Sequence, residues 1–490
     1  FLRSTKLYNT FDVLARGETT MLRKLLFFGL VLASISLNAF ALEETIGDFT
    51  FTYTVSDNEA TITHYAVQNA HTTFTVPATL GGYPVVYLAI TGGSGSGFSM
   101  FDVTSFVIPS TVISIANLTF LTYSEWYKNR PSGYVYLGKV LVEYNGTPPA
   151  NISVLNDTLG IEKSVFSGHP TITAVELPQS LKYIGSSAFS GCSGIPSISL
   201  PDNIKIISAS AFSGCSRIQS LVLPSSLKTL GGSAFYGCTA LTNDLILPNG
   251  VTQIGVSAFQ DCSLLRSVKI SDSVTTLSSS AFSGCTSLSL AEIGANVAVI
   301  EGSAFYNCAN LSFISLPASV ASIASSAFSN CTKLKQVYCF PSVAPGGTGN
   351  IFTSSPQIHV LSSASGYTIP TWRGGTITTD LENCPLVSFD SQGGTFISPQ
   401  YFPCGKPYGT LPQPVKNGYL FLGWHTQPMG DGERIKSTLL SPQTAVKRYT
   451  HSGDVPKQST HTPISILSMR VNPQSSMRMR PQLLRSPMAH

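Results

Sequence analysis

Residues 218–238, IQSLVLPSSLKTLGGSAFYGC, contain the pattern that decides the fold. The segment begins with L-x-L-P at 221–224, continues with L-x-x-L-G at 227–231, and ends with Ala234-Phe235 and Cys238. The alternation of apolar residues at 221–224 predicts a short strand that is buried on one face. Pro224 should end this strand, because proline cannot donate a hydrogen bond to a β-ladder.

The same pattern recurs along the chain at a nearly constant interval. The Phe of the Ala-Phe pair returns every 23 residues, with a single step of 24, and a Cys follows it at a fixed offset. The Phe positions are Phe189, Phe212, Phe235, Phe259, Phe282, Phe305 and Phe328. The Cys positions are Cys192, Cys215, Cys238, Cys262, Cys285, Cys308 and Cys331.

This periodicity predicts a repeat solenoid in which each unit forms one coil. A single coil cannot bury its apolar side chains, so the coils must stack. The strands are expected to form one curved parallel sheet. The other side of each coil should consist of turns and short 3₁₀ or α-helical segments, because Gly and Ser around the Ala-Phe pair are poor helix formers. A small bulge within 241–245 can absorb the one extra residue.

The seven cysteines of the repeat are predicted to be a structural ladder of buried free thiols. Residues 23 apart occupy the same place on successive coils, an odd number cannot pair completely, and no C-x-x-C motif occurs. They should act as small hydrophobic side chains in a slot of limited size. The pairing of Cys339, Cys384 and Cys404, which lie off the ladder, stays open.

The ends of the chain differ from its body. Residues 21–41 have two basic residues, a short apolar run and the Ala39-Phe40-Ala41 site of a secretory signal peptide, which predicts export and cleavage before Leu42. Residues 1–20 are expected to be upstream read-through. No later hydrophobic span follows, so the mature chain is predicted to lack a transmembrane segment.

Charge excludes one class of partner. Charged residues make up 11% of the chain, and the positive excess lies in residues 1–42 and 447–490, which leaves 43–446 with a net charge of −5. Without a basic stripe in the body of the protein, nucleic acid is not an expected partner.

The repeat units resemble the BspA-type leucine-rich repeats of bacterial surface proteins. The resemblance rests on Ser186–Cys192 and Leu223–Leu227, and it extends upstream to Phe51–Ile62, Val76–Val85 and the interruption at 126–141. It implies a right-handed leucine-rich-repeat superhelix over residues 47–373. We expect degenerate N-terminal repeats and a cap in residues 42–150, since Phe98–Leu121 and Phe166 lack parts of the motif, and the regular array in residues 151–373.

A different unit follows the array, after a connector that includes Gly374-Gly375. Val387–Thr395, Tyr408–Pro412 and Gly418–Trp424 are three strand candidates separated by Gly and Pro turns. They resemble the Listeria–Bacteroides repeat of internalin-like proteins, which implies a small β-grasp-like module over residues 386–446, here incomplete. Either a shifted reading frame or a disordered basic tail explains the composition of residues 447–490, and we favour the shifted frame.

The sequence contains no recognisable catalytic motif. The run Gly92–Gly97 fits neither G-x-S-x-G nor G-x-G-x-x-G, and the eight His residues show no metal-ligand spacing. We therefore expect a protein that is not an enzyme, with no cofactor and no metal.

A binding face is expected on the concave side of the sheet, where side chains vary between repeats while the interior residues do not. These positions are Ser199, Val222, Ile246, Lys269, Glu292, Ser315 and Tyr338, with Ser197, Ser220, Ser267, Phe313 and Gln336 in the neighbouring column. Phe313 and Tyr338 are the expected aromatic anchors. The predicted function is protein–protein binding at the cell surface or outside the cell, as in adhesion to host matrix or to other cells. The alternatives are an envelope spacer and a module that binds surface glycans.

Overall fold

The structure, a computed structural model, describes residues 41–69, 71–95, 102–116, 121–379, 381, 386–389, 400–401, 411, 413, 415, 419–425, 470–472 and 476–485. The chain divides into two units. The first comprises residues up to Thr111 together with Thr119–Trp126, and the second comprises Val112–Leu118 and everything from Tyr127 onward. The predicted signal peptide, except Ala41, lies outside the described residues.

The first unit is built on a sheet with the order β1-β2-β3-β6-β5. Alternating aromatic and threonine residues at 49–55 make a strand with one buried face, and Asp57 and Asn58, both with positive φ, form the two-residue turn to the next strand. The strands are β1 (Leu42–Ile46), β2 (Phe49–Ser56), β3 (Glu59–Val67), β5 (Thr79–Leu80) and β6 (Tyr83–Gly95). A separate parallel pair joins β4 (Thr73–Thr75) and β7 (Ser105–Val107).

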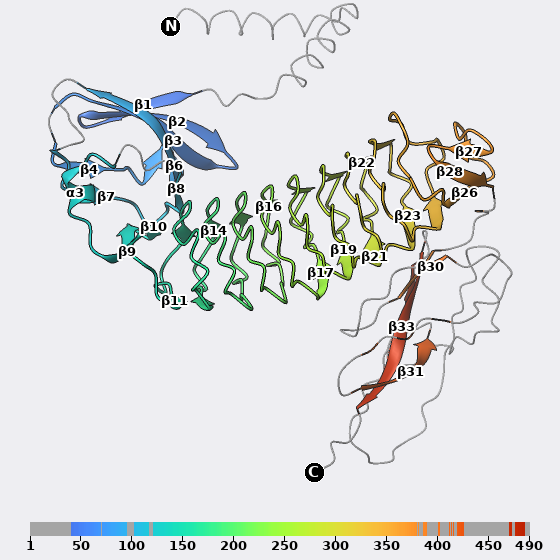
Figure 1. The fold of residues 1–490 in the computed structure, drawn as a ribbon. Coiled ribbons are helices and arrows are strands. Elements are labelled where there is room, and N and C mark those ends of the chain that lie inside the picture. The colour runs from blue at the N-terminus through green and yellow to red at the C-terminus, as the bar shows by residue number, and fades with distance from the viewer. Residues whose placement is uncertain are drawn as a thin grey trace, which may run out of the picture. The chain divides into compact units, whose positions relative to one another are not determined.

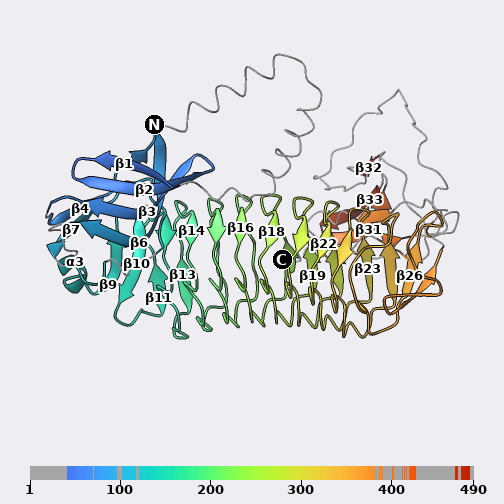
Figure 2. The same ribbon diagram turned by 90° about the horizontal axis from the view of Figure 1, so that it is seen from above.

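The second unit is a solenoid of stacked coils, so the predicted fold class is confirmed (Figures 1 and 2). Its longest ladder has ten strands, and eight of them are two-residue strands at the L-x-x-L-G segment of successive coils. The strands are β9 (Gly133–Leu137), β10 (Val140–Asn145), β12 (Gly160–Ile161), β14 (Tyr183–Ile184), β15 (Ile206–Ile207), β16 (Thr229–Leu230), β18 (Gln253–Ile254), β20 (Thr276–Leu277), β22 (Val299–Ile300) and β24 (Ser322–Ile323).

The strands predicted at the L-x-L-P segment form a second ladder in three pieces. The pieces are β11 (Asn151–Ser153) with β13 (Ala174–Glu176); β17 (Asp244–Ile246), β19 (Ser267–Lys269) and β21 (Leu290–Glu292); and β23 (Phe313–Leu316), β25 (Gln336–Cys339), β26 (Gln357–Val360), β28 (Gly375–Thr378) and β27 (Thr371–Trp372). The structure thus differs from the expected single sheet, because the coils at 197–199 and 220–222 form no strand and the opposite side carries a ladder of its own.

The interior of the array explains the Ala-Phe-Cys pattern. Nine phenylalanines, from Phe166 to Phe352, stack with ring centroids 5.2–5.7 Å apart. In most coils the Phe amide donates to the carbonyl of the next coil's Ala, as from Phe212 to Ala234 at 2.8 Å. The Ser before each Ala-Phe pair turns the chain with φ between +55° and +60°, for example at Ser233 and Ser326. A small side chain at this position limits the cost of a left-handed backbone.

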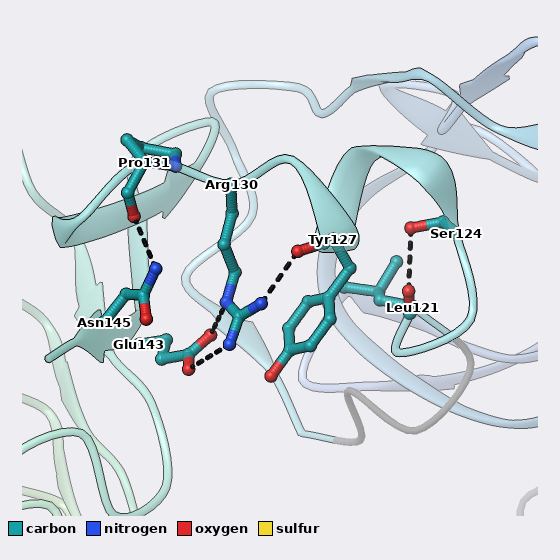
Figure 3. Close-up of polar contacts among 7 residues, drawn as sticks. All are labelled: Leu121, Ser124, Tyr127, Arg130, Pro131, Glu143 and Asn145. Atoms are coloured by element: carbon teal, nitrogen blue, oxygen red, sulfur yellow. Dashed lines mark hydrogen bonds and ion pairs between the residues drawn. The ribbon is translucent and has the colours of Figure 1, made fainter.

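The only helix among the described residues is α3 (Glu125–Lys128). Just before it, the Ser124 hydroxyl donates to the Leu121 carbonyl at 2.7 Å (Figure 3). On its C-terminal side, Arg130 forms a two-pronged ion pair with Glu143 at 2.7 and 3.1 Å and donates to the Tyr127 carbonyl at 2.8 Å (Figure 3). These bonds fix the segment that leads into β9.

The array ends later than predicted. The sequence assigns residues after 373 to a connector, but Gly375–Thr378 forms β28, which pairs with β26. Arg373 and Gly374, both with positive φ, make the tight turn from β27. The Arg373 guanidinium then donates to the carbonyls of Ile323, Gly346, Thr348 and Gly349 at 2.8–3.2 Å. These hydrogen bonds tie the turn after β27 to the loop at 346–349 and to the coil that carries Ile323.

Beyond the array, β29 (Leu386–Phe389), β30 (Gln400–Tyr401) and β31 (Tyr419–His425) contain parts of the predicted module. The candidate strand at 408–412 lies outside the described residues except residue 411. Within the predicted tail of residues 447–490, the described residues form strands β32 (Arg470–Asn472) and β33 (Ser476–Arg485). β33 pairs with β29 and β31. Met and Arg alternate at 477–480, which is a strand pattern that the composition of the tail does not reveal.

Candidate binding face

The L-x-L-P ladder presents two parallel rows of side chains on its outer side, which together we call the strand face. The central residue of each strand is buried, as Leu245, Val268 and Ala291 are, except that Ile377 in the last coil is partly buried. The residues on either side of it belong to the two rows. The first row contains Ser197, Ser220, Asp244, Ser267, Leu290, Phe313, Gln336, Gln357 and Thr376. The second row contains Ser199, Val222, Ile246, Lys269, Glu292, Ser315, Tyr338, His359 and Thr378.

An apolar pair lies near the start of the second row. Val222 is 75% exposed and Ile246 is 58% exposed, although both are large apolar side chains on neighbouring coils. Ser199 and Ser220 are exposed beside them. The pair offers apolar area that a partner could remove from water.

Asn243 holds this part of the face together. It is the residue added by the 24-residue step, and its side-chain amide takes the place of a strand. Its Oδ1 accepts from the Leu221 amide at 3.1 Å, and its Nδ2 donates to the Leu221 carbonyl at 2.8 Å. The bulge expected within 241–245 is therefore bridged by a side chain, which ties the coil that carries Val222 to the coil that carries Ile246.

The next coils carry charge. Lys269 Nζ lies 2.6 Å from Glu292 Oε1, and both side chains are partly buried. Ser267, predicted to face outward, is only 2% exposed, and its hydroxyl donates to Asp244 Oδ1 at 2.5 Å. Because these groups already satisfy one another, this segment of the face is a fixed polar surface.

The last coils carry aromatic and amide side chains. The rings of Tyr338 and His359 stack with centroids 4.9 Å apart, and His359 Nε2 lies 2.5 Å from Gln336 Oε1. His359, Gln357 and Thr378 were not expected from the sequence to belong to this face, because the Ala-Phe-Cys markers end at Cys331. The alternation in Gln357-Ile358-His359-Val360 could have revealed this further coil.

The cysteine ladder lies in the interior, away from the strand face. All seven ladder cysteines and Cys339 are buried and free. Each ladder thiol contacts the carbonyl of the preceding coil's Phe, from 2.9 Å at Cys192 to 3.4 Å at Cys238. Burial raises the pKa of Cys192 to about 11 and that of most other ladder thiols further, so thiolates do not form at neutral pH. Cys384 and Cys404 lie outside the described residues.

Among the described residues, no three or more His, Cys, Asp or Glu side chains are grouped so that they could share a metal ion. Within the same part of the chain, no helix has the length and apolar character needed to cross a bilayer.

Two known families match parts of this chain. Residues 159–264 and 242–358 match the BspA type leucine rich repeat region, in six copies, and residues 386–445 match the Listeria-Bacteroides repeat domain. No curated protein matches the chain.

Several solved structures are similar. A leucine rich repeat protein of T. pallidum is 29% identical, with 38% of this chain and 88% of that chain covered and a TM-score of 0.34. A leucine-rich repeat protein of Bacteroides ovatus is 20% identical, with 68% and 99% covered and a TM-score of 0.38. A leucine rich cell surface protein of Faecalibacterium prausnitzii is 21% identical, with 69% and 98% covered and a TM-score of 0.32.

Proposed function

Since residues 159–358 are BspA-type leucine-rich repeats and residues 386–445 are a Listeria–Bacteroides repeat, we propose that this chain is an exported, non-catalytic surface protein that binds other proteins through its strand face. BspA-like repeat proteins are cell-surface proteins, and leucine-rich repeats are generally protein-interaction modules without catalytic activity. Adhesion to host matrix or to neighbouring cells is the proposed role. Residues 21–41 are the proposed signal peptide.

The observation that carries the proposal is the contrast between a constant interior and a varied outer face. Phe, Ala and Cys repeat in every regular coil, while the second row changes from serine to Val222 and Ile246, then to the Lys269–Glu292 pair. Variation on a rigid scaffold is what a composite recognition surface requires. The exposed apolar pair is the proposed centre of the contact, since protein interfaces concentrate their energy in a few desolvated residues.

The test is binding of the purified full chain to an array of extracellular-matrix proteins, with a disordered chain of matched charge as the control. We expect saturable binding to one class of protein that persists at raised salt, because apolar contacts are not screened. Absence of binding to every matrix protein would favour a spacer role for the array.

A double variant, Val222→Ser with Ile246→Ser, then locates the contact. The replaced side chains are exposed, so the fold should be kept, and binding should weaken at least about tenfold. The matched control is Val256→Ser, because Val256 is 53% exposed but follows β18 on the other ladder. Equal binding by the double variant and the control would move the contact away from the proposed centre.

A further inference from the structure

The last coils of the strand face differ in chemistry from the coils before them. Here β23, β25, β26 and β28 pair in parallel and in register, and each strand has four residues. We call the eight outer side chains of these strands the terminal patch: Phe313, Gln336, Gln357 and Thr376 in the first row, and Ser315, Tyr338, His359 and Thr378 in the second. It forms the longest paired stretch of the strand face within the described array.

Five of the eight side chains of the terminal patch contact one another. Tyr338 and His359 stack with an interplanar angle of 22°, and His359 Nε2 lies 2.5 Å from Gln336 Oε1. Gln357 Nε2 donates to Thr378 Oγ1 at 2.9 Å, although Gln357 is exposed. Contacts that hold polar side chains in place before a ligand arrives reduce the entropy lost on binding.

The terminal patch carries no Lys, Arg, Asp or Glu. In contrast, the preceding coils contribute Asp244, Lys269 and Glu292 to the same two rows. A strongly charged ligand would therefore find no opposite charge in the terminal patch and would gain little from it.

The polar groups of the terminal patch have the same hydrogen-bonding capacity as hydroxyl groups. The amides of Gln336 and Gln357, and the hydroxyls of Ser315, Thr376 and Thr378, can each donate and accept hydrogen bonds. A sugar hydroxyl also does both. The rings of Phe313 and Tyr338 are partly exposed and supply apolar surface between these groups. Aromatic surface with a few fixed polar groups is typical of sites for small ligands.

From this combination we propose that the terminal patch binds a neutral oligosaccharide, which contacts the Phe313 and Tyr338 rings and exchanges hydrogen bonds with Gln336, Gln357 and Thr378. This site is separate from the protein contact proposed at Val222 and Ile246. The chain would then hold two ligands of different chemistry on one ladder.

Affinity electrophoresis of the full chain tests the proposal, with soluble dextran, mannan or laminarin in the gel and polygalacturonate or heparin as charged comparisons. We expect at least one neutral polysaccharide to slow migration. The retardation should persist at about 0.5 M NaCl, because hydrogen bonds and ring contacts are screened little. No retardation by any neutral polysaccharide, or retardation by the charged ones alone, overturns the proposal.

Two single variants link the binding to the terminal patch. Tyr338→Ala removes a ring, and Gln357→Ala removes an exposed amide that the fold does not need. Each should weaken polysaccharide binding about tenfold, while Val256→Ser, on the other ladder, should not change it. If Tyr338→Ala unfolds, Gln357→Ala decides alone. Unchanged retardation of folded Gln357→Ala, or a loss of matrix-protein binding without any sugar binding, shows that the terminal patch does not take sugars.

Discussion

Replacement or deletion of Asn243 tests whether a side chain has taken over the ladder at the irregular coil. Leu221 is 2% exposed, and both its amide and its carbonyl bond to the Asn243 side chain. In Asn243→Ala these two backbone groups lose their partners, at about 1–3 kcal/mol each when water cannot replace them. Because Asn243 is itself half-exposed, water can recover part of this. We therefore expect a net loss of about 2–4 kcal/mol.

Deletion of Asn243 should behave in the opposite way. It restores the 23-residue step, so Leu221 and Leu245 can pair through their backbones as Leu245 and Val268 do in β17 and β19. The deletion should therefore stay within about 1 kcal/mol of the parent chain, although it removes a residue. At a residue without this role, substitution by alanine would cost less stability than deletion. The reversed order is therefore specific to the role proposed for Asn243.

Urea unfolding followed by circular dichroism gives the stability difference, and hydrogen exchange of the Leu221 amide gives the local effect. Asn296→Ala is the matched control, because Asn296 is exposed and makes one bond to a carbonyl, that of Asp272, at 2.9 Å. It should cost no more than about 0.5 kcal/mol. If Asn243→Ala matches this control, or if the deletion costs as much as Asn243→Ala, the assigned role of Asn243 is wrong.

Three other changes probe the array. Phe259→Ala removes a ring that stacks at 5.5 and 5.6 Å on its two neighbours, and it should cost about 3–5 kcal/mol in urea unfolding. Arg373→Ala should lower the thermal midpoint and speed amide exchange in the last coils, and Arg373→Lys should restore little, since an ammonium cannot reach four carbonyls at once. Burial raises the pKa of the Glu162 carboxyl above its ordinary value of 4.5, so the folded chain binds the carboxyl proton more tightly than the unfolded chain does. The stability that this protonated carboxyl contributes is therefore lost as the pH rises above 4.5. Glu162→Gln keeps an acceptor for the Ile115 amide but has no carboxyl to ionise. The unfolding midpoint of this variant, relative to that of the parent chain, should therefore rise as the pH is raised from about 4 to about 7.

The interior of the array could be predicted from the sequence because every coil repeats it. Ala234, Phe235 and Cys238 recur with fixed spacing. A position that keeps the same residue type in successive coils must be enclosed and of constant size. The ladder at Thr229–Leu230 was missed for a related reason. Two residues per coil are too few to show an alternation, and only the stacking of eight such two-residue strands on β9 and β10 makes them a sheet.

Irregular coils were harder to predict, because their contacts depend on residues that occur once. Nothing in the sequence around Asn243 says that its amide will bond to Leu221, since the pairing arises only when two coils are placed side by side. Ser267 was placed in the outer row by its register, and it is buried because Asp244, a residue of the preceding strand, bonds to it. Register predicts which side of a strand a residue occupies, but neighbours decide whether it is exposed.

The same reasoning bears on where recognition can evolve in a solenoid. A change at Phe259 or Cys262 disturbs two interfaces, because each coil contacts the coil before it and the coil after it. A change at Val222 or Gln357 affects side chains that point away from the stack. The bonds that join the coils beneath them are made by the backbone at Gln357 and by the Asn243 side chain at Leu221. Stability therefore constrains the interior of every coil and leaves the two rows free to differ. For this reason one ladder can carry an apolar pair, an ion pair and an uncharged aromatic patch within a few coils, and each can be altered without unfolding the others.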